Sequence, residues 1–224
     1  MAFTGVRRTN AQDTCSICHE PRFISERQPL KARSQFAYIP LASRLQLQWN
    51  QPQRAKILKE YRQQLQHTYQ HGIVRDVFDG NLFRDYHQQT LRLFQDPRDI
   101  ALSMSLDGVQ LTNRKTHEVW PIILTNLNLP PDCRVKAENI LASMLIPGPR
   151  SPKELDSYLY PLVEEMELLG SHGVPAFDSH SNERFTMRAW IVLVTGILLY
   201  SLITPDLHAS LFFIWPIITN SVFI

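Results

Sequence analysis

One acid is the residue whose type and position point most directly to chemistry. Asp107 ends the stretch 101–106, "ALSMSL", which is apolar or small throughout, and Gly108 follows it. An acid that ends a buried strand lies at the carboxyl edge of a sheet, where open α/β sheets bind ligands. Carboxylates at such an edge can hold two divalent cations that stabilise the attacking and leaving oxygens at a phosphodiester. Asp-Gly is also a common hairpin turn, so spacing alone leaves both interpretations open.

A cysteine pair is the second candidate site. Cys15 and Cys18, in "CSIC", have the C-x-x-C spacing in which two thiolates chelate one zinc ion. Zinc takes four ligands, so this pair is half a site, because Cys133 is remote in sequence and His19 is too close to Cys18 to reach the same ion. A redox role needs a strand-to-helix setting, which "HEPRF" does not offer. Two unliganded thiols remain the alternative.

The other ionisable residues have structural interpretations. Acids that flank the first apolar strand are predicted to cap helices or to pair with Arg75, Arg84 and Arg98. His67 and His71 are four residues apart on an expected helix, but no third metal ligand follows at a useful distance. These acids are Asp76, Asp79, Asp96 and Asp99, and the other histidines without metal spacing are His87, His117, His172 and His180.

Composition indicates a globular protein of one or two domains. The chain has 224 residues, of which 44% are hydrophobic and 20% are charged, and its net charge of +2 is too small to indicate a nucleic-acid partner. Three cysteines and a first segment without an apolar run suggest a reducing compartment. The N-terminal part is basic and could contact DNA through Arg7, Arg8, Arg22, Arg27, Lys31 and Arg33.

The elements that must position Asp107 follow from apolar spacing and turn residues. The segment 52–71 predicts an amphipathic helix that Gly72 ends, and a turn at Asp79–Gly80 leads into a short helix. Apolar runs then predict three strands, within the ranges 99–111, 118–130 and 137–149.

The last third of the chain predicts a crossover and a fourth strand. Ser151 can cap a helix that runs to about residue 173, which Pro161 should kink or split. The segment 183–196 starts like a helix and runs into an apolar strand. Hairpins followed by a helical crossover indicate an α/β fold.

The C-terminal run gives an alternative interpretation. The apolar segment 189–204 is 16 residues long, about 24 Å as a helix, against about 30 Å for a hydrocarbon core. A span of about 189–207 includes Pro205 and Asp206, and it would make the chain a tail-anchored membrane protein without enzymatic activity. Alternatively, "WIVLVTG" is a buried strand.

Several motifs together resemble the transposases of the CACTA (En/Spm) superfamily. The resemblance runs from about Asp13 to Gly196 and is most specific between Asp96 and Met166. The motifs, in order, are "TCSICHEPRF", "QFAYIPLASRLQ", "VFDG", "FQDPRDIALSMSLDGVQL", "WPIILTNLNLPPDCRVKAENILASMLIPGPRSPKELDSYLYPLVEEM" and "GVPAFD".

The resemblance implies a ribonuclease-H-like core whose carboxylates bind Mg²⁺ or Mn²⁺, nick transposon ends and join them to target DNA. The motif "SLDG" matches the first catalytic acid, which gives Asp107 that role. Cys15 and Cys18 match the second half of a zinc ribbon that binds Zn²⁺. The resemblance also implies DNA as the partner and the nucleus as the location, whereas the tail-anchored alternative implies a membrane.

The resemblance ends at Gly196. Ile197 stands where the second catalytic aspartate of the family is expected, and no later motif follows. A shift of reading frame or a translated intron would produce such a break, so the expectation is an inactive, truncated transposase fragment. The expected organisation is a partial zinc ribbon and basic module at 1–40, a helical linker at 41–90, a partial core at 91–196 and an apolar tail at 197–224.

Overall fold

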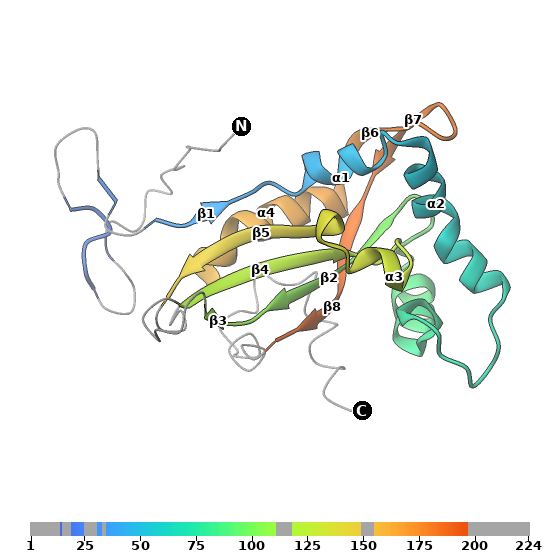
Figure 1. The fold of residues 1–224 in the computed structure, drawn as a ribbon, viewed down its shortest axis with the longest axis horizontal. Helices are drawn as coiled ribbons and strands as arrows, with labels where there is room; N and C mark the ends of the chain where they lie inside the picture. Colours follow the sequence, from blue (N-terminus) through green and yellow to red (C-terminus); the bar gives the residue numbers. More distant parts are fainter. Residues whose placement is uncertain are drawn as a thin grey trace.

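The structure is a computed structural model that describes residues 14, 19–24, 31–32, 35–110, 118–148 and 155–196. Within these residues, a six-stranded mixed sheet has the strand order β1–β5–β4–β2–β8, with β3 beside β4 (Figure 1). The predicted α/β class is confirmed. The strands are β1 (Ala37–Tyr38), β2 (Ile100–Leu106), β3 (Val109–Gln110), β4 (Glu118–Asn126), β5 (Ile140–Pro147) and β8 (Ala189–Thr195).

The sheet is antiparallel at first and parallel after one crossover. β4 pairs antiparallel with both β2 and β5. Helix α4 (Asp156–Ser171) then crosses over, and the hairpin of β6 (Val174–Asp178) and β7 (Glu183–Met187) leads into β8, which runs parallel to β2. The predicted order of hairpins followed by a crossover is therefore confirmed.

Several helices lie between β1 and β2 in sequence, and two short ones lie between β4 and β5. Pro52 begins α2, where its missing N–H costs no helical hydrogen bond, and the helix ends at His67, before Gly72. The other helices are α1 (Ala42–Gln48), the 3₁₀ helix η1 (Val77–Asp79), the π-helix η2 (Leu82–Thr90), α3 (Pro131–Arg134) and the 3₁₀ helix η3 (Ala137–Asn139).

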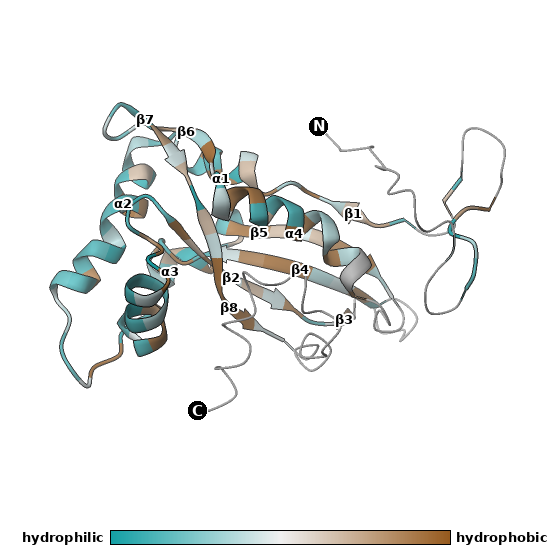
Figure 2. Ribbon diagram, turned by 180° about the vertical axis from the view of Figure 1, so that it is seen from behind, coloured by the Kyte–Doolittle hydropathy of each residue, from teal (hydrophilic) through white to brown (hydrophobic). Residues whose placement is uncertain are grey.

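Two apolar clusters lie on opposite faces of the sheet. The larger cluster packs one face against α1 and α4, and Figure 2 shows these helices in front of the brown strands. The smaller cluster joins η1 and η2 to one end of the other face through Phe78, Phe83 and Trp190. Ala101 belongs to the smaller cluster and Leu102 to the larger, because successive strand residues face opposite sides.

The crossover region differs from the prediction in two places. The segment from Glu183 to Met187 is a strand, not the start of a helix, because it pairs with β6 and buries alternate side chains. Pro161 does not split the predicted helix, because it lies inside the single helix α4, where buried Leu159 and Leu162 on either side of it pack against the core. The predicted cap, Ser151, lies outside the described residues.

The membrane span predicted at about 189–207 is not supported. Its first part, Ala189–Thr195, is the strand β8, which pairs with β2 within the sheet. A strand in this position cannot belong to a membrane-spanning helix. Among the helices of the described ranges, none is long and apolar enough to cross a bilayer.

Candidate functional site

Asp107 lies at an interruption in strand pairing, between β2 and β3. Leu106 pairs with Ile122 of β4, and Val109 pairs with Val119 of the same strand. Two residues separate the paired positions on each strand, so the chain keeps its direction and register through Asp107. The hairpin-turn interpretation of Asp107 is therefore wrong, because β3 continues beside β4.

The opposite strand helps to explain the interruption. The register places Asp107 across from Pro121 and Gly108 across from Trp120. Proline has no N–H to donate to the strand ladder. A Cβ on Gly108 would lie 2.9 Å from the ring of Trp120, so this position requires glycine unless the ring moves. The apolar run in the sequence did not reveal this role of Trp120.

The carboxylate of Asp107 lies at the carboxyl end of a central strand. Its side chain is half-buried, and its Oδ1 accepts the N–H of Gly108 at 2.8 Å. β8 ends at the same edge, since Ser105 pairs with Thr195 in the parallel register. A carboxylate here can bind a cation or a substrate donor at this edge.

Gly196 brings the end of β8 unusually close to β2. A Cβ at this position would clash with the carbonyl oxygen of Leu106, and the backbone of Gly196 has φ +131°. L-residues with side chains rarely adopt that conformation. The glycine that ends "WIVLVTG" is therefore needed for the two strands to reach the edge together.

Most of the other predicted acids form ion pairs away from Asp107. Arg75 Nε donates to Asp79 Oδ2 at 2.9 Å, and Arg98 Nη2 donates to Asp96 Oδ2 at 2.8 Å, which confirms these two predicted pairs. Arg84 differs from the prediction, because it donates to Asn81 at 3.0 Å and lies over the ring of Tyr69. These acids stabilise loops and are not close to the edge that carries Asp107.

Two buried ionisable residues, Asp99 and Arg62, contact the chain that enters β2. Burial raises the pKa of Asp99, whose Oδ2 accepts the N–H of Asp96. Burial also lowers the pKa of Arg62 to about 10, and the guanidinium donates to the carbonyl oxygens of Phe94 and Asp96 at 3.0 and 2.7 Å. These contacts fix the chain that enters β2, so they position the strand that carries Asp107.

Carboxylates that sequence reasoning missed also have structural partners. Glu165 of α4 accepts the N–H groups of Leu41 and Ala42 at the start of α1, together with the hydroxyl of Tyr38. Asp178 is fully buried and lies 3.9 Å from Lys59 Nζ. Both residues lie within motifs of the resemblance, but the local sequence does not indicate their partners, which are distant along the chain.

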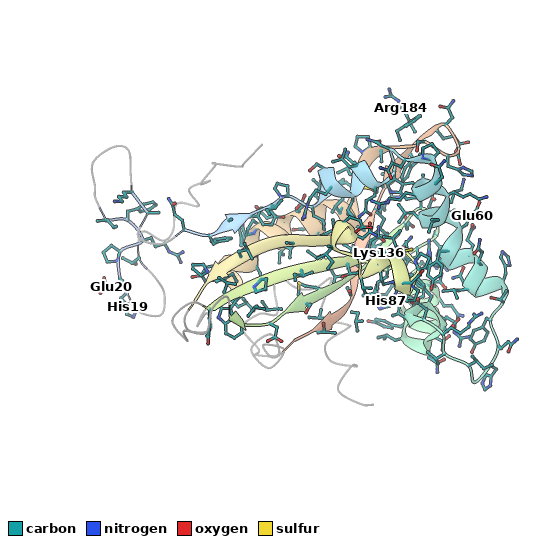
Figure 3. The ribbon with its side chains drawn as sticks, in the orientation of Figure 1. His19, Glu20, Glu60, His87, Lys136 and Arg184 are labelled. Atoms are coloured by element: carbon teal, nitrogen blue, oxygen red, sulfur yellow. The ribbon has the colours of Figure 1, made fainter. Side chains whose placement is uncertain are left out.

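The histidines do not form a metal centre in the described ranges. His87 is buried among aromatic rings of the η2 region, which lies at the end of the sheet away from β1 (Figure 3). Within the described ranges, no group of three or more His, Cys, Asp or Glu side chains could hold a metal ion. His117 lies outside those ranges.

Cys15 and Cys18 lie outside the described residues, but the chain on either side of them is described in part. Thr14 and Pro21 form an antiparallel bridge, and Arg22 Nε donates to the carbonyl oxygen of Thr14 at 3.3 Å. His19 adopts φ +57°. The bridge brings together the two ends of the segment that contains the cysteine pair.

The predicted DNA-contacting residues are only partly described. Lys31 accepts the N–H of Ile24 through its carbonyl oxygen at 2.8 Å, and Phe23 pairs with Ala32. Figure 3 shows this part of the chain, with His19 and Glu20, projecting beyond the β1 end of the sheet. Arg7, Arg8, Arg27 and Arg33 lie outside the described residues.

The third cysteine lies far from the described part of the N-terminal segment. Cys133 is a free thiol in α3, and α3 lies at the opposite end of the sheet from residues 19–24 (Figure 1).

Comparison with known protein families gives one match. The model for the transposase family tnp2 matches residues 71–201, which is more than half of the chain. Neither the comparison with curated proteins nor that with solved structures gives a match.

Proposed function

The chain belongs to the tnp2 family of transposases, and from this premise we propose that its sheet is the first part of a ribonuclease-H-like nuclease core of the CACTA type. The strand connectivity supports the proposal. Three antiparallel strands, β2, β4 and β5, are followed by a helical crossover and by β8, which lies parallel to β2. Such a core places acids from β2 and β8 at one edge of the sheet.

Asp107 is then the first metal-binding carboxylate. Its position after β2, at the edge where β8 also ends, is the observation that supports this assignment. The paired residues on either side, Leu106 and Val109, hold the backbone of Asp107 beside β4. A ligand on a rigid element holds its geometry better than one on a loop.

The described residues do not supply the rest of a two-metal site. Mg²⁺ prefers six oxygen ligands, and the described residues bring no cluster of three ligating side chains to the edge. The residue after Gly196 is Ile197, which has no ligating atom in its side chain. The described residues, with Ile197 next in the sequence, therefore do not fit a pair of catalytic cations, and we propose that this chain does not cleave or join transposon ends.

A cleavage assay tests this conclusion. The full chain is incubated with transposon-end duplexes and Mn²⁺, and no nicking above background is expected from either wild type or Asp107→Asn. Nicking by the wild type that Asp107→Asn abolishes would overturn the proposal of inactivity.

A second variant tests Asp107 as a ligand without relying on activity. Ile197→Asp should strengthen Mn²⁺ binding measured by electron paramagnetic resonance, because it adds a carboxylate after the strand parallel to β2. Ile197→Asn is the matched control without the charge. If Ile197→Asp binds Mn²⁺ no better than Ile197→Asn, or binds it equally well after Asp107→Asn, the assignment of Asp107 is wrong.

The N-terminal segment is proposed to bind DNA without sequence preference. Its basic residues attract phosphates, and Cys15 and Cys18 would order it by sharing a zinc ion with other ligands. The bridge from Thr14 to Pro21, which brings the two ends of the segment with the cysteine pair together, supports this proposal. Binding to a random duplex should weaken steeply with salt. Replacing both cysteines by serine should weaken binding to the duplex further only if zinc orders the segment.

DNA binding also agrees with a nuclear location, which microscopy of a tagged chain would test.

A further inference from the structure

One face of the sheet lacks cover from the described residues over most of its width. Two rows of side chains cross β2, β4 and β5 on this face. None of these side chains is buried, whereas the face towards α4 is fully packed. The rows, together called the open face, are Ser103, Thr125 and Ile140, and Ser105, Ile123 and Ala142.

The contrast with the other face is large. Met104, Leu124 and Met144, which alternate with residues of the open face, are at most 1% exposed. On the open face Ile140 is 39% exposed, and Leu145, which follows it on β5, is 45% exposed. In Figure 1 the open face is turned towards the viewer and α4 lies behind the sheet.

The chemistry of the open face selects an apolar occupant. Its two rows hold hydroxyl, methyl and aliphatic groups, and Asp107, two residues beyond Ser105 on the same face, lies past the end of the rows. Such a surface offers no charge to phosphate, and it gains most from contact with aliphatic and aromatic side chains. The C-terminal segment 197–224 has side chains of this kind. Only one of its 28 residues, Asp206, is charged.

We propose that the C-terminal segment 197–224 of the same chain folds over the open face. The segment begins two residues after Thr195, which pairs with Ser105 of that face. It is therefore tethered next to the surface, and tethering raises its effective concentration there. Three strands are about 10 Å from first to last, a distance that about seven helical residues span, so the segment is long enough to cover both rows.

Limited proteolysis of the full chain tests this docking. Chymotrypsin cleaves after aromatic residues such as Tyr200, Phe212 and Phe213, and a docked segment should resist cleavage there. Ser105→Lys places a charge in the centre of the open face and should speed tail cleavage at least fivefold. Thr186→Lys is the matched control, because Thr186 is an exposed strand residue of β7 outside the open face. It should leave the rate unchanged.

A milder variant controls for the possibility that Ser105→Lys unfolds the protein. Ile140→Ser removes apolar contact without adding a charge and should speed tail cleavage two- to fivefold while far-ultraviolet circular dichroism stays native. Equal cleavage rates in the wild type, Ser105→Lys and Ile140→Ser would overturn the proposal.

Other occupants give different results. If the face instead binds a second copy, sedimentation would show a dimer that Ser105→Lys dissociates while tail cleavage is unchanged. If the tail inserts into lipid, it would resist chymotrypsin only in the presence of phosphatidylcholine vesicles. Either result would overturn docking within the chain.

Discussion

Arg134 of α3 and Asp76 at the start of η1 form an almost fully buried ion pair. The arginine Nη2 lies 2.7 Å from the aspartate Oδ2, and the exposed fractions of the two side chains are 11% and 1%. The same carboxylate accepts the hydroxyl of Tyr61 at 2.6 Å and the N–H of Val77 at 2.7 Å. The pair therefore joins α2, η1 and α3 at one end of the sheet.

Arg134→Met should destabilise the protein strongly. The substitution leaves Asp76 as a buried charge without its cation, which typically costs about 3–5 kcal/mol of unfolding free energy. Urea unfolding followed by tryptophan fluorescence measures the loss. Lys136→Met, two residues along and exposed, is the control and should change stability by less than about 0.5 kcal/mol. Comparable losses in the two variants would show that the pair contributes little.

Tyr38 should make the protein less stable at alkaline pH. Burial, and then the hydrogen bond to the Glu165 carboxylate, raise the pKa of Tyr38 above its ordinary value. A raised folded-state pKa gives stability that is complete below the unfolded pKa of about 10 and is lost as the pH rises above it. The melting temperature should therefore fall between about pH 9.5 and 11.

The control for this prediction is another tyrosine. Tyr38→Phe should reduce the alkaline fall in melting temperature, although it also removes a hydrogen bond and lowers stability at neutral pH. Tyr160→Phe, at a side chain that is 49% exposed, should leave the pH dependence unchanged. An unaltered alkaline slope in Tyr38→Phe would contradict the role assigned to Tyr38.

His87 should make the protein less stable at acidic pH. Burial among Phe83, Phe94 and Tyr86 lowers the pKa of His87. The folded state thus disfavours the imidazolium, so its stability is complete above the unfolded pKa of about 6.5 and declines as the pH falls below that value. His87→Phe should flatten the melting temperature between about pH 6.5 and 5 relative to wild type, whereas His67→Phe, at an exposed position, should not. Parallel curves for wild type and His87→Phe would contradict this.

The sheet was predictable because its strands carry continuous apolar runs. The three segments assigned around Asp107 became β2, β4 and β5, and "WIVLVTG" became β8, since buried strands need little more than length and apolar side chains. The hairpin of β6 and β7 was missed because "ERFTM" carries only two buried side chains, Phe185 and Met187. That short alternation does not distinguish a strand from a helix start.

Of the candidate site, the sequence predicts Asp107 but not the residues that surround it. Asp107 is predictable because it ends an apolar run, and the family match supports the resemblance that includes it. Its surroundings depend on contacts across strands. Trp120 lies against Gly108, and Gly196 lies against the carbonyl of Leu106. Neither contact has a local sequence signal, because register between strands decides them.

Gly108 and Trp120 should show a specific coupling in stability. Gly108→Ala places a Cβ 2.9 Å from the Trp120 ring, and overpacking of this kind typically costs about 1–3 kcal/mol. The Trp120 atoms nearest to this Cβ are Cη2, Cζ2 and Cζ3, which belong to the six-membered ring of the indole. A phenylalanine side chain has no atoms at those positions. In a Trp120→Phe background, Gly108→Ala should therefore cost less unfolding free energy than it does in the wild type.

A double-mutant cycle measures this coupling by urea unfolding. The expected interaction energy is about 1 kcal/mol, in the range found for residues in contact. Gly80→Ala is the control, because its Cβ would meet the carbonyl oxygen of Val77 at 3.2 Å and not Trp120. Its cost should be the same in both backgrounds. If Gly108→Ala also costs the same in both backgrounds, the Trp120 ring does not determine the requirement for glycine beside Asp107.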